Sequence, residues 1–109
     1  MEILNKGFSK LEIPEAIELK LEPAINATKI SSYNGEMLFT AKKIYFLPMF
    51  ESDALFYDPF VIDVAEIESY SKKGLAGFVI TLKDGQTITL SNVFRKLREK
   101  IVTAIEERR

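Results

Sequence analysis

The 109-residue sequence contains neither cysteine nor histidine. The absence of cysteine excludes disulfides, thiol nucleophiles and thiolate metal ligands. The absence of histidine removes the usual general base and the commonest protein ligand of metals, so a serine or threonine nucleophile would have no histidine to activate it. We therefore expect a protein that is not an enzyme and that binds neither a cofactor nor a metal.

A charge excess of one sign is also missing. Fifteen Lys and Arg residues are balanced by sixteen Asp and Glu residues, which gives a net charge of −1. A nucleic-acid-binding domain usually carries a basic excess, so we expect no nucleic-acid partner. Apolar runs are short, as in Ile44–Leu47, whereas a membrane-spanning helix needs roughly 20 apolar residues. We expect a cytoplasmic protein, either in the cytosol or peripheral to the inner face of the membrane.

The length suits one domain with one hydrophobic core. We therefore expect residues 1–109 to form a single domain, in which residues 1–23 are an N-terminal extension. Pro14 would suit the first turn of a helix and Pro23 its end. However, Ile17, Leu19 and Leu21 alternate with charged residues, as in a strand. The sequence leaves both structures open for residues 14–22, a short helix or an edge strand.

From residue 24 onward, apolar residues recur at every second position, which predicts strands. A first strand would end at Asn34-Gly35, a strong hairpin signal because both residues tolerate positive φ. An aromatic loop would follow Pro48, and Lys72–Gly77 would form a turn. The expected strands are short and cover residues 24–33, 36–41, 43–47, 60–64, 66–71, 78–82 and 88–90.

The last hairpin can be placed in register. Opposed residues of an antiparallel pair share a face, so the apolar residues of the two strands should face one another. A three-residue loop, Lys83–Gly85, achieves this because it pairs Ile80 with Ile88 and Phe78 with Leu90. It also places Gly85 in the left-handed position that such loops require.

The C-terminal segment has helical periodicity. Its apolar stripe predicts an amphipathic helix of about four turns that packs on the strands, with Ser91 or Asn92 as its N-cap. The residues of this stripe are Val93, Phe94, Leu97, Ile101, Ala104 and Ile105.

The order of elements resembles the pleckstrin-homology-like superfold, and it is most similar to the GRAM and bacterial pleckstrin-homology subgroup. Residues Gly35–Pro48 resemble the segment over that family's second and third strands, and Asp63–Tyr70 resembles a later strand junction. The resemblance implies a seven-stranded, bent antiparallel barrel or sandwich capped by one C-terminal helix. Lipid-binding members carry basic residues in the first hairpin loop. Tyr33–Glu36 has none, so the resemblance does not extend to inositol-phosphate binding.

Two basic pairs, Lys42-Lys43 and Lys72-Lys73, are candidate anion sites. In an up-and-down meander they would lie at opposite ends and would not converge. We favour solvated turn lysines, with a weak anion-binding surface around Lys72 and Lys73 as the alternative. The aromatic residues Phe50, Phe56 and Tyr57 lie in the 48–59 loop among acidic residues. They either form an exposed patch for a partner or fold back onto the core, which we favour.

Basic residues crowd the first half of the expected helix, where they oppose the macrodipole. They either pair with strand carboxylates such as Glu66 and Glu68, which we favour, or form a docking face for an acidic partner through Arg95 and Arg98. The acidic residues do not predict a catalytic pair, because they alternate with outward-facing positions as on a solvated surface; they are Asp53, Asp58, Asp63, Glu66 and Glu68.

These features predict a non-catalytic binding module. We expect it to recognise another protein or a second copy of itself through a loop end, a sheet edge or the basic helix face. The alternative is weak peripheral binding to anionic membrane lipid through Lys72, Lys73 and the aromatic loop.

Overall fold

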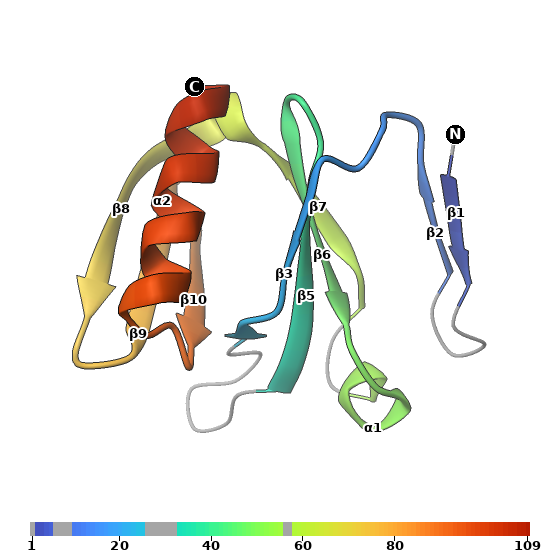
Figure 1. Ribbon diagram of the computed structural model, residues 1–109, viewed down its shortest axis with the longest axis horizontal. Coiled ribbons are helices and arrows are strands. Elements are labelled where there is room, and N and C mark those ends of the chain that lie inside the picture. Colours follow the sequence, from blue (N-terminus) through green and yellow to red (C-terminus); the bar gives the residue numbers. More distant parts are fainter. Residues whose placement is uncertain (1, 6–9, 26–32, 56–57) are drawn as a thin grey trace.

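The computed structural model describes residues 2–5, 10–25, 33–55 and 58–109. These residues form strands, one short α-helix, one 3₁₀ turn and a long C-terminal α-helix (Figure 1). In chain order, the elements are β1 (Glu2–Asn5), β2 (Lys10–Ile13), β3 (Leu19–Leu21), β4 (Ala24–Ile25), β5 (Tyr33–Phe39), β6 (Lys43–Pro48), α1 (Glu51–Ala54), β7 (Phe60–Asp63), η1 (Val64–Glu66), β8 (Ile67–Lys73), β9 (Gly77–Leu82), β10 (Thr87–Ser91) and α2 (Arg95–Arg108).

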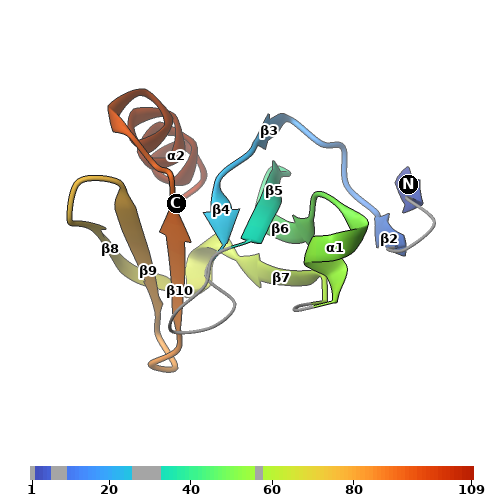
Figure 2. The ribbon, with the colours of Figure 1, turned by 90° about the horizontal axis from the view of Figure 1, so that it is seen from below.

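Eight of the strands form one antiparallel sheet. Its order is β7-β6-β5-β4-β10-β9-β8, and β3 pairs with β5 beside β4. Because β3 and β4 follow one another along the same edge of β5, they act as one interrupted strand, and the sheet has the seven strand positions that the sequence predicts. The sheet is bent and does not close on itself, and α2 lies against its open side (Figure 2). The predicted fold class is confirmed.

The main core lies between the bent sheet and α2. Met37 and Phe39 of β5 face Ile44 and Phe46 of β6, with further apolar side chains from β8, β9 and β10. Phe46 stacks on Phe60 with ring centroids 4.7 Å apart. From the helix, the fully buried residues are Ile101, Ala104 and Ile105.

The predicted register of the last hairpin is confirmed. Ile80 pairs with Ile88 and Phe78 with Leu90. The amide of Leu82 donates to the carbonyl of Gln86 at 2.8 Å, which closes the three-residue loop. Gly85 has φ +91°, the left-handed conformation that the loop needs. Cross-strand matching of apolar residues therefore determines this hairpin.

The N-terminal segment covers the outer face of the first half of the sheet. β1 and β2 form a separate two-stranded sheet, and Ile13 is fully buried against Leu38, Tyr45 and Leu47 on the outer side of β5 and β6. Both faces of β5 and β6 are therefore buried, which explains why these strands are almost continuously apolar. For residues 14–22, the strand alternative applies to Leu19–Leu21, which pairs with β5.

Several local predictions were wrong. Asn34 and Gly35 are not a turn but lie inside β5, paired with Ala24 and Pro48. Pro48 ends β6, and the following loop contains the helical turn α1. Lys72 and Lys73 belong to β8, so the turn is restricted to Gly74–Ala76. Asn34 and Gly35 do not form the predicted turn because β5 pairs with a strand on each side. The apolar residues of β5 are also buried on both faces, which stabilises the continuous strand.

The start of α2 also differs from the prediction. Its N-cap is Phe94, without a side-chain hydrogen bond, rather than Ser91 or Asn92. Asn92 has φ +56° and makes the bend by which the chain leaves β10. Phe94 is more than half exposed instead of packing on the sheet. The helical stripe therefore begins at Leu97, one turn later than the sequence pattern indicates.

Tyr45 joins the N-terminal segment to the sheet and should make stability pH-dependent. Burial and a 3.1 Å hydrogen bond from its hydroxyl to Glu15 raise the pKa of Tyr45 above its ordinary value of 10.0. Above pH 10 the unfolded chain loses this proton first, so the folded state loses stability as pH rises. Between about pH 9 and pH 11, around the ordinary tyrosine pKa of ~10, the free energy of unfolding measured in urea should fall more for the wild type than for Tyr45→Phe. Parallel losses would contradict the assignment, since Tyr70 and Lys20 titrate in both proteins.

Candidate functional site

Backbone hydrogen bonds across the loops define two ends of the sheet. At one end, the amide of Val64 donates to the carbonyl of Lys42. At the other, the amide of Val93 donates to the carbonyl of Ala76 at 2.9 Å. The structure thus separates Lys42 and Lys43 from Lys72 and Lys73, as strand parity predicts. The second end, at the bottom of Figure 1, also carries α1 and the start of α2.

The Val93–Ala76 hydrogen bond brings two candidate surfaces together. It holds the β8–β9 turn beside the N-terminus of α2, so that Lys72 and Lys73 lie at the same end as Arg95. Two large apolar side chains are exposed on the same two segments, Leu75 at 80% and Phe94 at 56%. We call Lys72, Lys73, Leu75, Phe94 and Arg95 the basic corner.

The basic corner contains no acidic residue in either segment, 71–77 or 92–96. Two features fix its backbone. Gly74 has φ +63°, and a Cβ on Gly77 would lie 2.3 Å from the carbonyl oxygen of Lys73. α2 also begins without an acidic residue in its first turn, so the positive end of the helix dipole adds to the cations. Apart from the pairing of Arg95 with Glu99, the corner therefore concentrates positive charge although the whole chain is almost neutral.

The aromatic loop contributes less to one surface than the sequence suggests. Phe50 is 53% exposed at the start of α1, and Phe56 and Tyr57 lie outside the described residues. Asp53 is buried, in contrast to the solvated position predicted for it, and accepts hydrogen bonds from the amides of Asn34 (3.1 Å) and Phe50 (3.2 Å). Its carboxylate therefore ties the loop to β5, which is a structural role.

In the part of the chain that the structure describes, the cations in the first half of α2 do not pair with strand carboxylates. Arg95 pairs with Glu99 of its own helix at 3.1 Å, one turn away. Within the described part of the chain, neither Glu66 nor Glu68 forms an ion pair with α2. The pairing favoured from the sequence is therefore wrong, and Arg98, which is half-buried, has no strand carboxylate as its partner.

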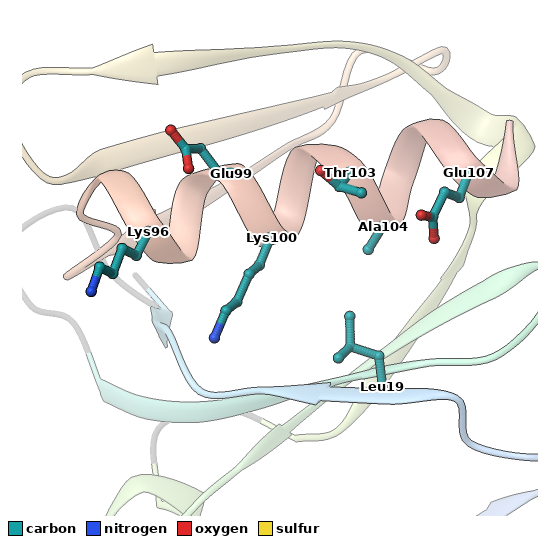
Figure 3. Close-up of a pocket in the computed structure, with 7 residues that line it drawn as sticks. All are labelled: Leu19, Lys96, Glu99, Lys100, Thr103, Ala104 and Glu107. Atoms are coloured by element: carbon teal, nitrogen blue, oxygen red, sulfur yellow. The ribbon is translucent and has the colours of Figure 1, made fainter.

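A groove of about 370 Å³ separates α2 from β3 (Figure 3). Leu19 of β3 and Ala104 of α2 face one another across it, and Lys96 and Lys100 point from the helix towards β3. Glu99 also lines the groove, and its carboxylate pairs with Arg95, whereas Glu107 lies at the C-terminal end of the groove. We call this space the seam groove, since it follows the line along which the sheet and the helix separate. Sequence periodicity alone did not indicate it, because it depends on how α2 leaves β10.

Arg108 joins the C-terminal end of α2 to the sheet and to the segment before β3. Its guanidinium donates to the carbonyl oxygens of Thr40 (2.7 Å) and Ala104 (2.9 Å) and to Glu18 (2.7 Å). It also lies 5.3 Å from the ring centroid of Phe39. The sequence pattern did not single out Arg108, although a basic side chain in the last helical turn is the expected complement of the dipole.

No protein-family model matches the sequence, and no curated protein is similar to it in sequence. Solved structures are similar in fold. The C-terminal domain of an unknown protein from Leishmania infantum has a TM-score of 0.67 at 16% identity, over 85% of this chain and 84% of that one. The linker-DH/PH domains of p115-RhoGEF give 0.69 at 12% identity, over 87% of this chain and 30% of that one.

The DH/PH domain of human ARHGEF11, in a ternary complex with human RhoA and its inhibitor, gives a TM-score of 0.65 at 13% identity, over 84% of this chain and 28% of that one. This chain thus spans less than a third of these exchange-factor structures. The fold is therefore pleckstrin-homology-like. The finer assignment to the GRAM and bacterial subgroup stays a prediction.

Among the described residues, no group of three or more acidic side chains is arranged to hold a metal ion. None of the helices in the described ranges has the length and apolar character needed to cross a bilayer.

Proposed function

We propose that this protein is a non-catalytic binding module that associates peripherally with anionic membranes through the basic corner. The observation that carries the proposal is the exposure of Leu75 and Phe94 beside three cations, Lys72, Lys73 and Arg95. Large apolar side chains exposed together commonly mark an interaction surface. Cations around them would draw an anionic lipid surface to that patch, at about 1 kcal/mol for each Lys or Arg near the surface.

The geometry gives this surface a defined orientation. Leu75 is at the tip of a tight turn, so it would be the first apolar side chain to enter the headgroup layer. Phe94 would follow, because the Val93–Ala76 hydrogen bond holds it next to that turn. Glu51, the first residue of α1, and Asp58, in the loop after it, would be repelled by the same membrane. This repulsion would turn the molecule so that the basic corner, and not the aromatic loop, faces the membrane.

Co-sedimentation with vesicles tests the proposal. The wild type should bind vesicles of phosphatidylcholine mixed with phosphatidylserine and should not bind phosphatidylcholine alone. Binding should fall between low salt and about 0.15 M salt because exposed charges are screened. Lys72→Glu with Lys73→Glu should reduce the partition coefficient by at least about tenfold, since each cation contributes on the order of 1 kcal/mol.

A matched control has the same change of charge at the opposite end of the sheet. Lys42→Glu with Lys83→Glu replaces two exposed lysines there and should leave much more of the binding than the corner variant. Leu75→Ser should weaken binding without changing its dependence on salt. Equal losses of binding in the two lysine variants would mean that only the net charge of the protein matters, and would refute the corner as the site. Absence of vesicle binding by the wild type at low salt would also refute it.

A protein partner, the first interpretation of the sequence, is supported by a different surface. None of the five residues of the basic corner lines the seam groove, and in the described part of the chain β3 beside the groove pairs only with β5. Binding at that groove would be compatible with a membrane bound at the corner.

A further inference from the structure

We propose that the seam groove binds an extended, acidic segment of a partner protein, which adds as a strand to the free edge of β3. This site is separate from the basic corner and does not depend on membrane binding. The inference rests on three features of the described residues, which are an unpaired strand edge, an apolar floor, and two cations without carboxylate partners.

The unpaired edge arises from the way the sheet opens. β10 pairs with β4 through Leu90 and Ser91, and in that register its continuation would run alongside β3. Instead the chain bends at Asn92 and forms α2. Within the described part of the chain, β3 pairs only with β5. One edge of β3 thus keeps backbone donors and acceptors that a further strand could use.

The groove has the size and lining of a binding site. Its volume of about 370 Å³ is within the range of roughly 300–1,000 Å³ found for ligand pockets. Leu19 and Ala104 form an apolar floor, and both pack against the main core. A side chain of an added strand could be buried there, next to the residues that already belong to the core. Burial of such a side chain on the apolar floor would therefore add to the affinity that the backbone hydrogen bonds of the added strand provide.

The two cations indicate the chemistry of the partner. Lys96 and Lys100 point across the groove (Figure 3), and neither forms an ion pair in the described part of the chain. They are four residues apart on α2, about 6 Å along the helix axis. Alternate residues on one side of an extended strand are about 6.4–6.8 Å apart. A segment with acidic residues at alternate positions would therefore place one carboxylate near each lysine.

Two carboxylates also line the groove, and of these Glu99 is paired with Arg95, so Glu107 sets the limit of this acidic preference. It lines the C-terminal end of the groove, 3.8 Å from Arg108, and would repel carboxylates placed there. The acidic residues of the partner should therefore lie over the first half of α2. Conversion of Glu107 to glutamine should tighten binding of an acidic segment or leave it unchanged.

The experiment uses a fluorescent twelve-residue peptide of alternating Glu and Val as the probe, with fluorescence anisotropy as the readout. Two comparison peptides separate the contributions. One alternates Lys and Val, and the other has the acidic sequence with N-methylated backbone amides on alternate residues, which removes strand pairing. The acidic peptide should bind, the basic peptide should not, and the methylated peptide should bind at least about tenfold more weakly, since each lost backbone hydrogen bond contributes to affinity.

Variants assign the site. Lys96→Glu with Lys100→Glu should weaken binding about tenfold or more, because two attractions become repulsions. Lys72→Glu with Lys73→Glu is the matched control. It makes the same charge change on β8, which is also an edge strand, and should preserve most of the affinity. Circular dichroism of both variants verifies that they fold.

Other outcomes overturn the inference. If the acidic peptide does not bind, or if the methylated peptide binds equally well, the groove does not accept a strand. If the β8 variant loses more affinity than the α2 variant, the peptide adds to the other edge. Vesicle binding tests the basic corner and peptide binding tests the seam groove. A protein that binds vesicles but not the acidic peptide would therefore refute only the proposal for the seam groove.

Discussion

Replacement of Arg108 by alanine should cost about 2–4 kcal/mol of folding free energy, the largest effect of any charged residue in the described chain. The Arg108 side chain is only 8% exposed and donates to the carbonyl oxygen of Thr40, a residue that is fully buried. The substitution leaves this acceptor unsatisfied and removes the cation from the face of Phe39. Glu18 is half exposed and returns to water, so its loss adds little.

Urea unfolding followed by circular dichroism measures this effect. Arg109→Ala is the control, because Arg109 is an adjacent arginine with greater exposure and a single pairing, to Glu106 at 3.4 Å. It should cost no more than about 1 kcal/mol. Arg108→Lys should recover only part of the loss, since one ammonium group cannot donate in the planar fork that reaches Thr40, Ala104 and Glu18. Equal costs for the two arginine variants would show that Arg108 does not hold α2 to the sheet.

The last hairpin was predictable because its information is local. Apolar residues alternate on both strands, and only one loop length matches them, with a glycine at the position that needs positive φ. The existence and length of α2 were predictable for a similar reason, since 3.6-residue periodicity continues over four turns. The start of the helix was not, because Phe94 is more than half exposed and thus is not part of the buried face that its spacing suggests.

The first half of the sheet was harder to predict because its strands are buried on both faces. Leu38, Tyr45 and Leu47 are covered by residues of the N-terminal segment, a contact between segments distant in sequence. A strand buried on two sides loses the alternation that identifies register. Consequently Asn34-Gly35 was the strongest local signal in that region, and it was wrong.

The candidate sites depended on tertiary structure to different degrees. Strand parity was sufficient to separate Lys42 from Lys72. It could not bring Lys72 and Arg95 to the same corner, because that juxtaposition results from the hydrogen bond between Val93 and Ala76. The seam groove could not be predicted from the sequence for a related reason. It exists because the chain leaves β10 at Asn92 and forms a helix where a further strand could have paired with β3.

Replacement of Ile13 by alanine should show whether the N-terminal segment folds together with the rest of the chain. Ile13 is fully buried against Leu38, Tyr45 and Leu47. Truncation of a buried isoleucine to alanine costs about 2–5 kcal/mol, because transfer free energy is lost and a cavity remains. If residues 1–109 unfold as one unit, urea unfolding should remain a single transition with an unchanged slope, and its midpoint should fall by that free energy divided by the slope.

Ile17→Ala is the matched control in the same cluster. Ile17 is only partly buried, so its truncation should cost less, on the order of 1 kcal/mol. A small effect of Ile13→Ala, with an early transition that precedes the main one, would mean that residues 1–13 detach before the sheet unfolds. That outcome would also expose Leu38 and Leu47 while the rest of the sheet is intact, and an apolar dye should then bind before the main transition. A single transition for both variants would instead make the N-terminal segment an integral part of the domain, because the outer face of β5 and β6 is apolar and needs its cover.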